Sequence, residues 1–511
     1  MTCKPALNEV QNLAEQGNMI SIYRELTADL ETPVSVYLKL QDEGPGFLLE
    51  SISGGEAVAR YSFVGVRPHS VLTALTDHIT IAQNGSQSTL PLENSKTPLD
   101  YLEAQMADIR FIPNPDLPRF SGGAVGFLSY DSVRRLETLP DSTRDELNIP
   151  EAVFMFTEAL VAFDHARQRL LIIANIRLDN DIAEAYQHGV SHIEEIVARL
   201  RAPLSPPITN SINPDTALKE TFLPRSNFSQ TEFEQMVLRA KEYIAAGDIF
   251  QVVLSQRLRG ETKASAFNIY RSLRSLNPSP YMVFMHFPGG LGTDNLQLIA
   301  ASPEMHVRLE DGIAQLRPIA GTRQRGRNHE EDVALAEELM RDEKELAEHI
   351  MLVDLGRNDL GRVCEYGTIH VSEMMGIERY SHVMHLVSEV RGRMKSGKNA
   401  FHLLRATFPA GTVSGAPKVR AMQIIEEQET VRRGIYAGVM GYIGYDGNMD
   451  SCIAIRTILM KGRSVYIQAG GGIVADSDPT REYEESLNKA RALSESVRLA
   501  EMEVNHDLIN R

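Results

Sequence analysis

Short apolar runs separated by turn residues dominate the first two hundred residues of the chain. Residues 78–82 form such a run and are followed by Asn84-Gly85, a frequent hairpin turn. Residues 159–163 and 170–174 form a second pair of apolar runs. Adjacent short strands joined by such turns pair antiparallel, so this part of the chain is predicted to form antiparallel sheet.

A helical pattern begins near residue 229. Ser229 and Glu232 have the spacing of a capping box, and apolar residues then recur on one helical stripe from Phe233 to Ile244. Gly247 ends the helix, and residues 249–258 then form a strand-like apolar run. The second half of the chain is therefore expected to contain helices as well as strands.

Two long apolar runs near the C-terminal end predict another hairpin. Residues 434–445 and 449–460 flank Asp446-Gly447, whose conformational freedom suits a tight turn. With the helices and hairpins above, the fold class is α+β. No repeat of 20 to 50 residues is present, which excludes solenoids and propellers.

The chain divides at a proline-rich stretch. Prolines at 203, 206, 207 and 214 stand among Ser, Thr and Asn without a helical or strand period, which is typical of a linker. The chain has 511 residues, which is enough for two large domains. We expect domains at 1–205 and 225–511, joined by a linker at 206–224.

Composition narrows the class of protein. Hydrophobic residues make up 43% and charged residues 23%, as in folded globular chains. The formal net charge of −16 argues against binding to nucleic acid. The three cysteines, Cys3, Cys364 and Cys452, form no C-x-x-C pair, and no 18-residue apolar run occurs. We therefore expect a cytoplasmic protein with no disulfide framework, no structural zinc and no membrane association.

Two helical segments carry paired carboxylates. Glu345 and Glu348 lie one turn apart, and Glu482 and Glu485 repeat this spacing in a helix that is predicted to begin at Asp478-Pro479. If the pairs converge, their oxygen atoms suit Mg²⁺. Such pairs are also common on solvated helix faces, and spacing alone favours that alternative.

Three consecutive glycines suggest a site for an anion. Gly470, Gly471 and Gly472 follow the apolar run 464–467, where bare backbone N–H groups can form an anion-binding nest. The triplet is not a G-x-G-x-x-G motif, and residues 411–418 do not fit the Walker pattern. Nucleotide binding is unsupported.

Two polar side chains lie in apolar strand-like runs. Arg456 lies within residues 453–458, and a buried arginine requires an anionic partner. An internal ion pair and a clamp for an anionic ligand are equally compatible with this position. His385 lies in a similar run, where a hydrogen-bonded core histidine is the more common case.

Together these segments resemble the chorismate-utilising enzymes, most closely the large subunits of anthranilate synthases. The resemblance covers nearly the whole chain and rests on motifs in the family's order. These are residues 48–51, 250–257, 277–282, 301–304, 318–322, 342–349 and 408–418, followed by the glycine triplet with its two glutamates. The resemblance implies a large sandwich of antiparallel β-sheets with flanking helices, and an active site in the C-terminal part.

The resemblance assigns roles to the candidate residues. It implies that Mg²⁺ is held by Glu348 and Glu485, with Glu345 and Glu482 in support. Glu304 is the expected general acid, His385 assists the elimination of pyruvate, and Thr412 is a further catalytic residue. The expected contacts to chorismate are Gly321, Thr322, Tyr436, Arg456, Gly470, Gly471 and Gly472.

Two positions indicate the reaction within this family. Gln251 stands where isochorismate and salicylate synthases carry a lysine that activates water, so ammonia is the expected nucleophile. Ala320 stands where many aminodeoxychorismate synthases carry a nucleophilic lysine, and a methyl group cannot take that role. The resemblance thus implies a lyase that makes anthranilate and pyruvate in tryptophan biosynthesis. The alternatives are an aminodeoxychorismate synthase of folate biosynthesis and a catalytically silent tryptophan sensor.

The resemblance also implies partners and control. The chain has no Cys-His-Glu amidotransferase signature, so ammonia is expected from a separate glutamine amidotransferase subunit in a heterotetramer. Two segments resemble the family's tryptophan-binding elements, and feedback inhibition by L-tryptophan is expected. Their residues are Leu49, Glu50, Ser51, Pro278, Ser279, Pro280, Tyr281 and Met282.

Overall fold

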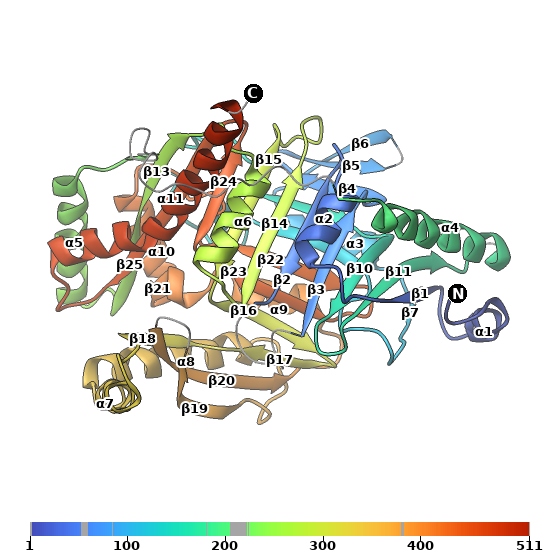
Figure 1. Ribbon diagram of the computed structural model, residues 1–511. Coiled ribbons are helices and arrows are strands. Elements are labelled where there is room, and N and C mark those ends of the chain that lie inside the picture. Colours follow the sequence, from blue (N-terminus) through green and yellow to red (C-terminus); the bar gives the residue numbers. More distant parts are fainter. Residues whose placement is uncertain are drawn as a thin grey trace.

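The computed structural model describes residues 3–52, 60–83, 85–179, 181–204, 222, 224–379 and 383–509. Two large β-sheets pack face to face, and helices cover their outer faces (Figure 1). The predicted α+β sandwich is confirmed. No helix among the described residues is long and apolar enough to cross a bilayer.

The first sheet contains thirteen strands, all paired antiparallel except β1 with β7. Its order is β12 (Arg225–Ser226), β13 (Gln251–Glu261), β25 (Ser464–Ile473), β24 (Thr457–Lys461), β15 (Leu296–Ser302), β14 (Tyr281–Phe287), β2 (Gly46–Glu50), β3 (Tyr61–Val66), β10 (Ala159–Asp164), β11 (Arg169–Arg177), β1 (Met19–Thr27) and β7 (Phe111–Ile112), with β21 (Gly415–Ala416) beside β13.

The second sheet contains twelve antiparallel strands. Its order is β18 (Ile319–Gln324), β20 (Val383–Arg393), β17 (Ile313–Leu316), β16 (Met305–Glu310), β23 (Met449–Ile453), β22 (Val439–Gly444), β8 (Gly123–Leu128), β9 (Ala152–Phe156), β4 (Ser70–Ala74), β5 (His78–Gln83) and β6 (Ser86–Pro91), with β19 (His370–Arg379) beside β20.

Helices flank both sheets. The first sheet is covered by α1 (Leu7–Leu13), α2 (Pro33–Leu40), α4 (Ile182–Arg201), α6 (Ala266–Leu276) and α11 (Pro479–Ile509). The second is covered by α3 (Pro98–Met106), α7 (His329–Leu339), α8 (Glu343–Gly361) and α9 (Ala400–Thr407). The helices α5 (Gln230–Ala245) and α10 (Lys418–Gln428) pack near β13, and the short turns η1 (Tyr130–Arg135) and η3 (Gly411–Val413) complete the elements.

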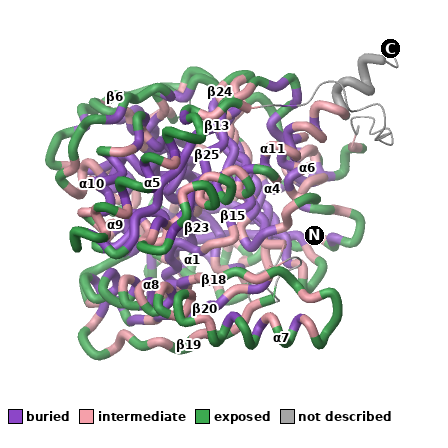
Figure 2. Tube along the Cα trace, turned by 90° about the vertical axis from the view of Figure 1, so that its left-hand side faces the viewer, coloured by how far each residue is buried: buried purple, intermediate pink, exposed green. Residues whose placement is uncertain are grey.

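Strand periodicity divides the core into layers. Along β11, Leu170 and Ile172 pack toward the helices, whereas Leu171 and Ile173 pack between the two sheets. Because successive side chains of a strand point to opposite faces, a strand buried on both faces is apolar throughout. Most strands are therefore buried inside an exposed outer layer of helices and loops, whereas β6 and β19 lie at the surface (Figure 2).

The predicted local elements largely form. β5 pairs with β6 and β10 with β11, both antiparallel. The helix α5 begins at the capping box, in which the Glu232 backbone N–H donates to Ser229 Oγ at 3.3 Å. All three cysteines are buried and unbridged.

One strand prediction is wrong. Residues 449–460 form two strands, because β23 belongs to the second sheet and β24 to the first. Residues 454–456 cross between them, and Arg456 has a φ of 50°. The preceding run also begins later than predicted, since β22 starts at Val439. The predicted Arg456 strand position is thus a crossing between the sheets.

The predicted linker lies almost wholly outside the described residues, which omit 205–221 and 223. Each sheet contains strands from both sides of it, because β2 pairs with β14 and β8 with β22. The domain boundaries at 205 and 225 stay a prediction.

Candidate active site

Arg456 lies at the centre of the candidate site, where the chain crosses between sheets. Its backbone carbonyl accepts from the Ala301 N–H at 3.1 Å, and its Nη1 donates to the Lys489 carbonyl at 2.5 Å. No carboxylate of the described residues forms an ion pair with this largely buried guanidinium. Burial lowers the pKa of Arg456, although Tyr436 and Glu485 oppose this shift. The arrangement favours the ligand clamp over the internal ion pair.

Glu304 lies between β15 and β16, beside the same crossing. Its backbone carbonyl accepts from the Ile453 N–H at 3.1 Å. Burial raises the pKa of the Glu304 carboxyl to about 7, although the Thr412 hydroxyl and the Lys489 ammonium oppose the shift. A large share of this carboxyl is therefore protonated at neutral pH, as a general acid requires.

Tyr436 lies near both Glu304 and Arg456, whose charges act on its hydroxyl. Burial raises the pKa of the Tyr436 hydroxyl to about 12, and the charges of Glu429 and Glu304 add to this effect. The phenol stays protonated at neutral pH and can donate a hydrogen bond to an anion.

His385 lies on β20 opposite β18. Its Nδ1 is 3.0 Å from the Gly321 carbonyl and 3.1 Å from Thr322 Oγ1. Because a carbonyl only accepts, this geometry assigns the proton to Nδ1. Burial and then the Arg456 charge lower the pKa of His385. Its imidazole is therefore neutral near pH 7.

The first glutamate pair lies on α8, which begins at the capping residue Asp342. Burial and the charge of Glu348 raise the pKa of Glu345, and Arg323 opposes the shift from 3.5 Å. Gln251 Nε2 donates to Glu348 Oε1 at 2.8 Å. The helix therefore presents two interacting carboxylates beside β13.

The second pair lies on α11, which begins at Pro479 as predicted. Burial raises the pKa of Glu482, and the charge of Glu485 adds to it. Lys489 Nζ lies 2.7 Å from Glu485 Oε1 and donates to the Gly470 carbonyl at 3.0 Å. A Cβ on Gly471 would lie only 3.0 Å from Glu482 Oε2, so glycine leaves room beside the carboxylate.

The donor set of the two pairs fits a hard divalent cation. All four side chains offer carboxylate oxygens as donors. Glu345 and Glu482 are partly buried, and each lies beside the like charge of the other glutamate in its pair. The Lys344 charge acts on Glu482, which places α8 near α11. Among the described residues, however, these glutamates do not form a group of ligand atoms within 4.8 Å of one another. The two carboxylates of each pair act on one another, and the pairs on α8 and α11 would have to approach further to share an ion.

The glycine triplet differs from its predicted conformation. Gly470, Gly471 and Gly472 lie within β25 and pair with β13, so they do not form a nest after a strand. Close approach of the backbone requires glycine at position 470, because a Cβ there would lie 2.1 Å from the Leu254 carbonyl oxygen. The bare strand lets Gln251 and the α11 carboxylates pack against its backbone.

Comparison with known proteins identifies the family of this chain. The family described as chorismate binding enzymes matches residues 47–495. The chain belongs to the chorismate-binding enzyme family. The predicted resemblance is confirmed, and so is the prediction that the chain is an enzyme.

Similar members of this family share one name, anthranilate synthase component 1. The chain is 48% identical to anthranilate synthase component 1 of Acetivibrio thermocellus over 96% of this chain and 98% of the relative. It is 47% identical to the component of the same name from Aquifex aeolicus, over 98% and 99%.

Two solved structures share this architecture. Anthranilate synthase component I from Streptococcus pneumoniae is 35% identical, covers 92% of this chain and 99% of its own, and has a TM-score of 0.72. The menaquinone-specific isochorismate synthase of Escherichia coli has a TM-score of 0.70 at 19% identity, over 96% and 99%. The second likeness shows the fold alone.

A cavity of about 50 Å³ lies beside Glu304 in this chorismate-binding enzyme. Its lining includes Glu304, Thr412, Pro318 and Leu355. Leu355 lies on α8 and Thr412 in η3, and the other two residues lie in connections between strands. Thr412 Oγ1 is buried and has no hydrogen-bond partner within 3.5 Å among the described residues. The Thr412 hydroxyl is therefore close enough to the Glu304 carboxyl to act on its pKa, but the two groups form no hydrogen bond within 3.5 Å.

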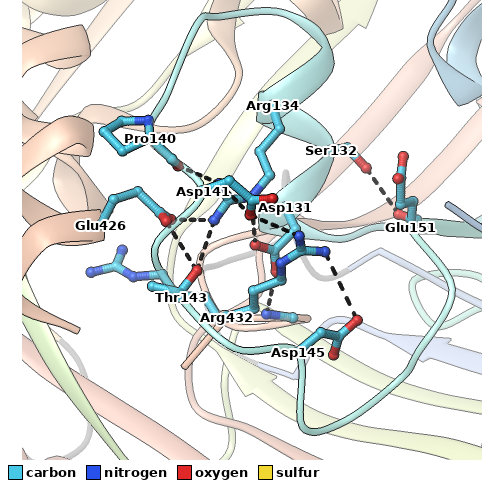
Figure 3. Close-up of polar contacts among 12 residues, drawn as sticks. Asp131, Ser132, Arg134, Pro140, Asp141, Thr143, Asp145, Glu151, Glu426 and Arg432 are labelled. Carbon is cyan, nitrogen blue, oxygen red and sulfur yellow. Dashed lines mark hydrogen bonds and ion pairs between the residues drawn. The ribbon is translucent and has the colours of Figure 1, made fainter. Parts of the chain in front are cut away.

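A roomier cavity of about 300 Å³ lies elsewhere, between residues 129–151 and 432–434. None of the predicted site residues lines it. Arg134 donates hydrogen bonds to Glu426 and to the Thr143 hydroxyl, and Arg432 donates one to Asp141 at 2.9 Å (Figure 3). These charges hold the 131–145 segment against α10 and give no evidence of a ligand site.

The structure brings the two predicted tryptophan elements together. β2 pairs with β14, so Leu49 faces Val283 and Glu50 faces Met282. The Ile52 N–H also donates to the Ser279 carbonyl at 3.3 Å. Segments about 230 residues apart in the sequence thus lie side by side in the interior of the first sheet.

Most polar groups at this junction have hydrogen-bond partners. Glu50 is buried and accepts from the Tyr270 hydroxyl and from Arg274, with Arg274 Nε at 2.9 Å. The Tyr281 hydroxyl donates to Asp450 at 2.9 Å. Ser51 Oγ is buried and lacks a hydrogen-bond partner among the described residues. Pro278 and Pro280 lie in the connection from α6 to β14.

Sequence reasoning missed two groups that organise the site. Lys489 bridges Glu485 and Gly470, and its spacing of four residues after Glu485 was the available signal. Arg433 and Glu429 form a fully buried pair at 2.6 Å that has the same spacing. Apolar periodicity does not mark charged residues that are buried as a pair.

Proposed function

We propose that this chain converts chorismate and ammonia into anthranilate and pyruvate, the committed step of tryptophan biosynthesis. The observation that supports this most is the largely buried Arg456, which forms no ion pair with a carboxylate of the described residues and lies near Glu304, whose carboxyl has a pKa raised to about 7. A dianionic substrate with a hydroxyl leaving group meets both requirements. The names of the similar relatives agree with this proposal.

Binding begins with the two carboxylates of chorismate. Arg456 and Tyr436 donate hydrogen bonds to the pyruvyl carboxylate, and Gly321 and Thr322 border the ring. Bound Mg²⁺, held by Glu348 and Glu485 with Glu345 and Glu482 in support, would neutralise and polarise the ring carboxylate. The glycine triplet of β25 leaves space for this close approach.

In the first chemical step ammonia forms a bond to the ring carbon ortho to the carboxylate. The double bonds shift, and the bond from the ring to the departing hydroxyl oxygen breaks. Glu304 gives its proton to that oxygen, which leaves as water. The added nitrogen loses a proton, so that aminodeoxyisochorismate and water are formed. Thr412 lies beside the carboxyl and orients it.

The second step eliminates pyruvate. A base removes the ring proton at the carbon that carries the new amino group, the ether C–O bond breaks, and the enolpyruvyl group leaves with a proton as pyruvate. His385 suits this role, because its Nδ1 proton is directed to Gly321 and its ring is neutral. Aromatisation supplies the driving force.

Gln251 and Ala320 support ammonia over other nucleophiles. Gln251 donates its amide to Glu348, and an amide is not a base that can activate water. Ala320 on β18 has no nucleophilic atom. Aminodeoxychorismate formation, in which nitrogen enters at another ring carbon, is the remaining alternative.

We further propose that a glutamine amidotransferase subunit supplies ammonia in a cytoplasmic heterotetramer. L-Tryptophan would bind at the junction of β2 and β14 and inhibit the enzyme. The closeness of both tryptophan elements and the unpartnered Ser51 hydroxyl support this regulatory site.

Magnesium dependence provides the first test. Replacing Glu485 by Gln removes one anionic oxygen donor, so we expect a rise of at least about 10-fold in the Mg²⁺ concentration for half-maximal pyruvate release. Glu484→Gln is the matched control, because Glu484 is exposed and not among the proposed ligands. An unchanged Mg²⁺ requirement in Glu485→Gln would refute the metal assignment.

A further inference from the structure

Two histidines and a carboxylate gather on the outside of the first sheet, away from the candidate active site. His188 and His192 lie one turn apart on α4, and Glu158 lies between β9 and β10. A metal site needs several ligand atoms close together. Among the described residues, these three side chains are the group of histidine, cysteine or acidic residues whose ligand atoms all lie within 4.8 Å of one another. In Figure 1, α4 lies on the opposite side from α8 and α11.

The distances within this cluster are close to those of a metal site. Glu158 Oε1 lies 3.6 Å from His188 Nδ1 and 3.9 Å from His192 Nδ1, and the imidazole rings are 4.3 Å apart. Ligand atoms around a tetrahedral Zn²⁺ at about 2.0 Å lie about 3.3 Å from one another. Small rotations of three partly exposed side chains therefore close the remaining gap.

The backbone that carries these ligands is fixed from both sides. The Glu158 carbonyl accepts from the Asn175 N–H at 2.7 Å, and the Ser21 hydroxyl donates to Asn175 Oδ1 at 2.8 Å. On α4, Gly189 lets the helix approach β11 closely, since a Cβ there would lie 2.6 Å from Ile176. This close approach places the histidines over the Glu158 turn, and the site is held before any ion binds.

Nearby positive charge is compensated. Two further basic groups, Arg177 and His69, lie near Glu158. Arg177 forms ion pairs with Asp108 at 2.6 Å and with Asp179 at 3.2 Å. The guanidinium is thus engaged with its own carboxylates and adds little net charge to the cluster.

We propose that Glu158, His188 and His192 bind one divalent transition-metal ion of the Zn²⁺ type. Two imidazoles and a carboxylate suit Zn²⁺ better than Mg²⁺, which prefers oxygen donors. Three protein ligands leave a fourth position for water, and the bound ion fastens α4 to the turn between β9 and β10. This site is separate from the carboxylates of the candidate active site.

Calorimetric titration of the whole purified chain with Zn²⁺, with excess Mg²⁺ present, tests this site. We expect one ion per chain, and at least about 10-fold weaker binding in His188→Ala and in His192→Ala. His329→Ala is the control, because it removes an exposed histidine from α7. His188 has a 63% exposed side chain, so its replacement leaves the core intact.

Two further readouts separate this site from other binding. Co²⁺ should give the intense visible absorption of a tetrahedral site in the parent chain and in His329→Ala, and lose it in the variants at 188 and 192. Zn²⁺ should raise the melting temperature of the parent but not that of the double variant. Absence of Zn²⁺ binding, or unchanged affinity in both histidine variants, would overturn the proposal.

Discussion

At the residue scale, the proposed chemistry depends on one carboxyl that is buried away from water. In water a glutamate carboxyl is ionised at neutral pH, and Glu304 becomes a proton donor near neutral pH only because burial raises its pKa to about 7. Its neighbours, the Thr412 hydroxyl and the Lys489 ammonium, limit the shift. Burial thus gives an ordinary glutamate the acidity that the proposed general acid requires.

This assignment predicts a pH profile. Since the acid acts when protonated and its folded pKa is about 7, kcat should be largest below that pH and fall as the pH rises through it. Stopped-flow rates should be measured with free ammonia held constant, so that ammonium titration does not enter. Glu304→Gln should lower kcat by about 10² to 10⁴ and remove this limb.

Glu310→Gln serves as the control for the pH experiment, because Glu310 lies at the far end of β16 from Glu304 and has no assigned role. Its profile should match the parent. A Glu304→Gln enzyme that retained both the rate and the alkaline decline would contradict the role of Glu304.

At the element scale, a buried ion pair joins the segments around the site. Arg433 donates to the Val413 carbonyl in η3 and to the Val253 carbonyl in β13, each at 2.7 Å. Its guanidinium lies 5.4 Å from the centre of the Tyr436 ring. Glu429 balances this charge and also accepts from the Ser255 N–H at 2.9 Å. One pair therefore joins β13 and η3 and lies against Tyr436, a proposed substrate contact.

Breaking that pair should be costly. Glu429→Gln leaves the Arg433 guanidinium buried without its counter-charge, so we expect a loss of about 3 to 5 kcal/mol in the free energy of unfolding. Glu427→Gln is the control, since Glu427 pairs with Arg420 on the surface and should cost less than about 1 kcal/mol. Urea unfolding of both variants measures the difference, and equal losses would argue against the pair.

The junction of β2 and β14 should determine inhibition without affecting turnover. Ser51→Phe fills the space beside an unpartnered hydroxyl, and we expect tryptophan inhibition to weaken by at least about 10-fold at unchanged kcat. Ser51→Ala separates the two causes, because it removes the hydroxyl without adding bulk. Normal inhibition in both variants would exclude Ser51 from the regulatory site.

Sequence patterns predicted elements better than the path between them. The hairpin of β10 and β11 and the helix α5 follow from local period and capping, which depend on neighbouring residues. The division of 449–460 between two sheets does not, because both halves are equally apolar and only Arg456 marks the crossing. Local periodicity does not reveal which sheet a buried strand joins.

The candidate site was predictable to a similar degree. Motif resemblance identified Glu304, His385 and the glutamates, and spacing placed each glutamate pair on one helix. The support from Lys489 and Arg433 required the folded structure, since these side chains act on residues from other strands. Tertiary proximity of charged groups has no signature in a single sequence.

At the scale of the whole molecule, the two halves of the chain share both sheets. β2 of the first half pairs with β14 of the second, and β8 pairs with β22. A ligand at the first junction therefore contacts strands that continue toward the catalytic connections, since β14 pairs with β15 and Glu304 follows β15. This continuity offers a physical path by which tryptophan could bias the catalytic half.

Product identification tests the central claim most directly. The purified chain should be incubated with chorismate, Mg²⁺ and ammonium salt, and its products separated by chromatography. We predict anthranilate and pyruvate in equal amounts, with formation suppressed by L-tryptophan and absent in Glu304→Gln. Accumulation of aminodeoxychorismate or isochorismate, or tryptophan binding without any turnover, would contradict the account.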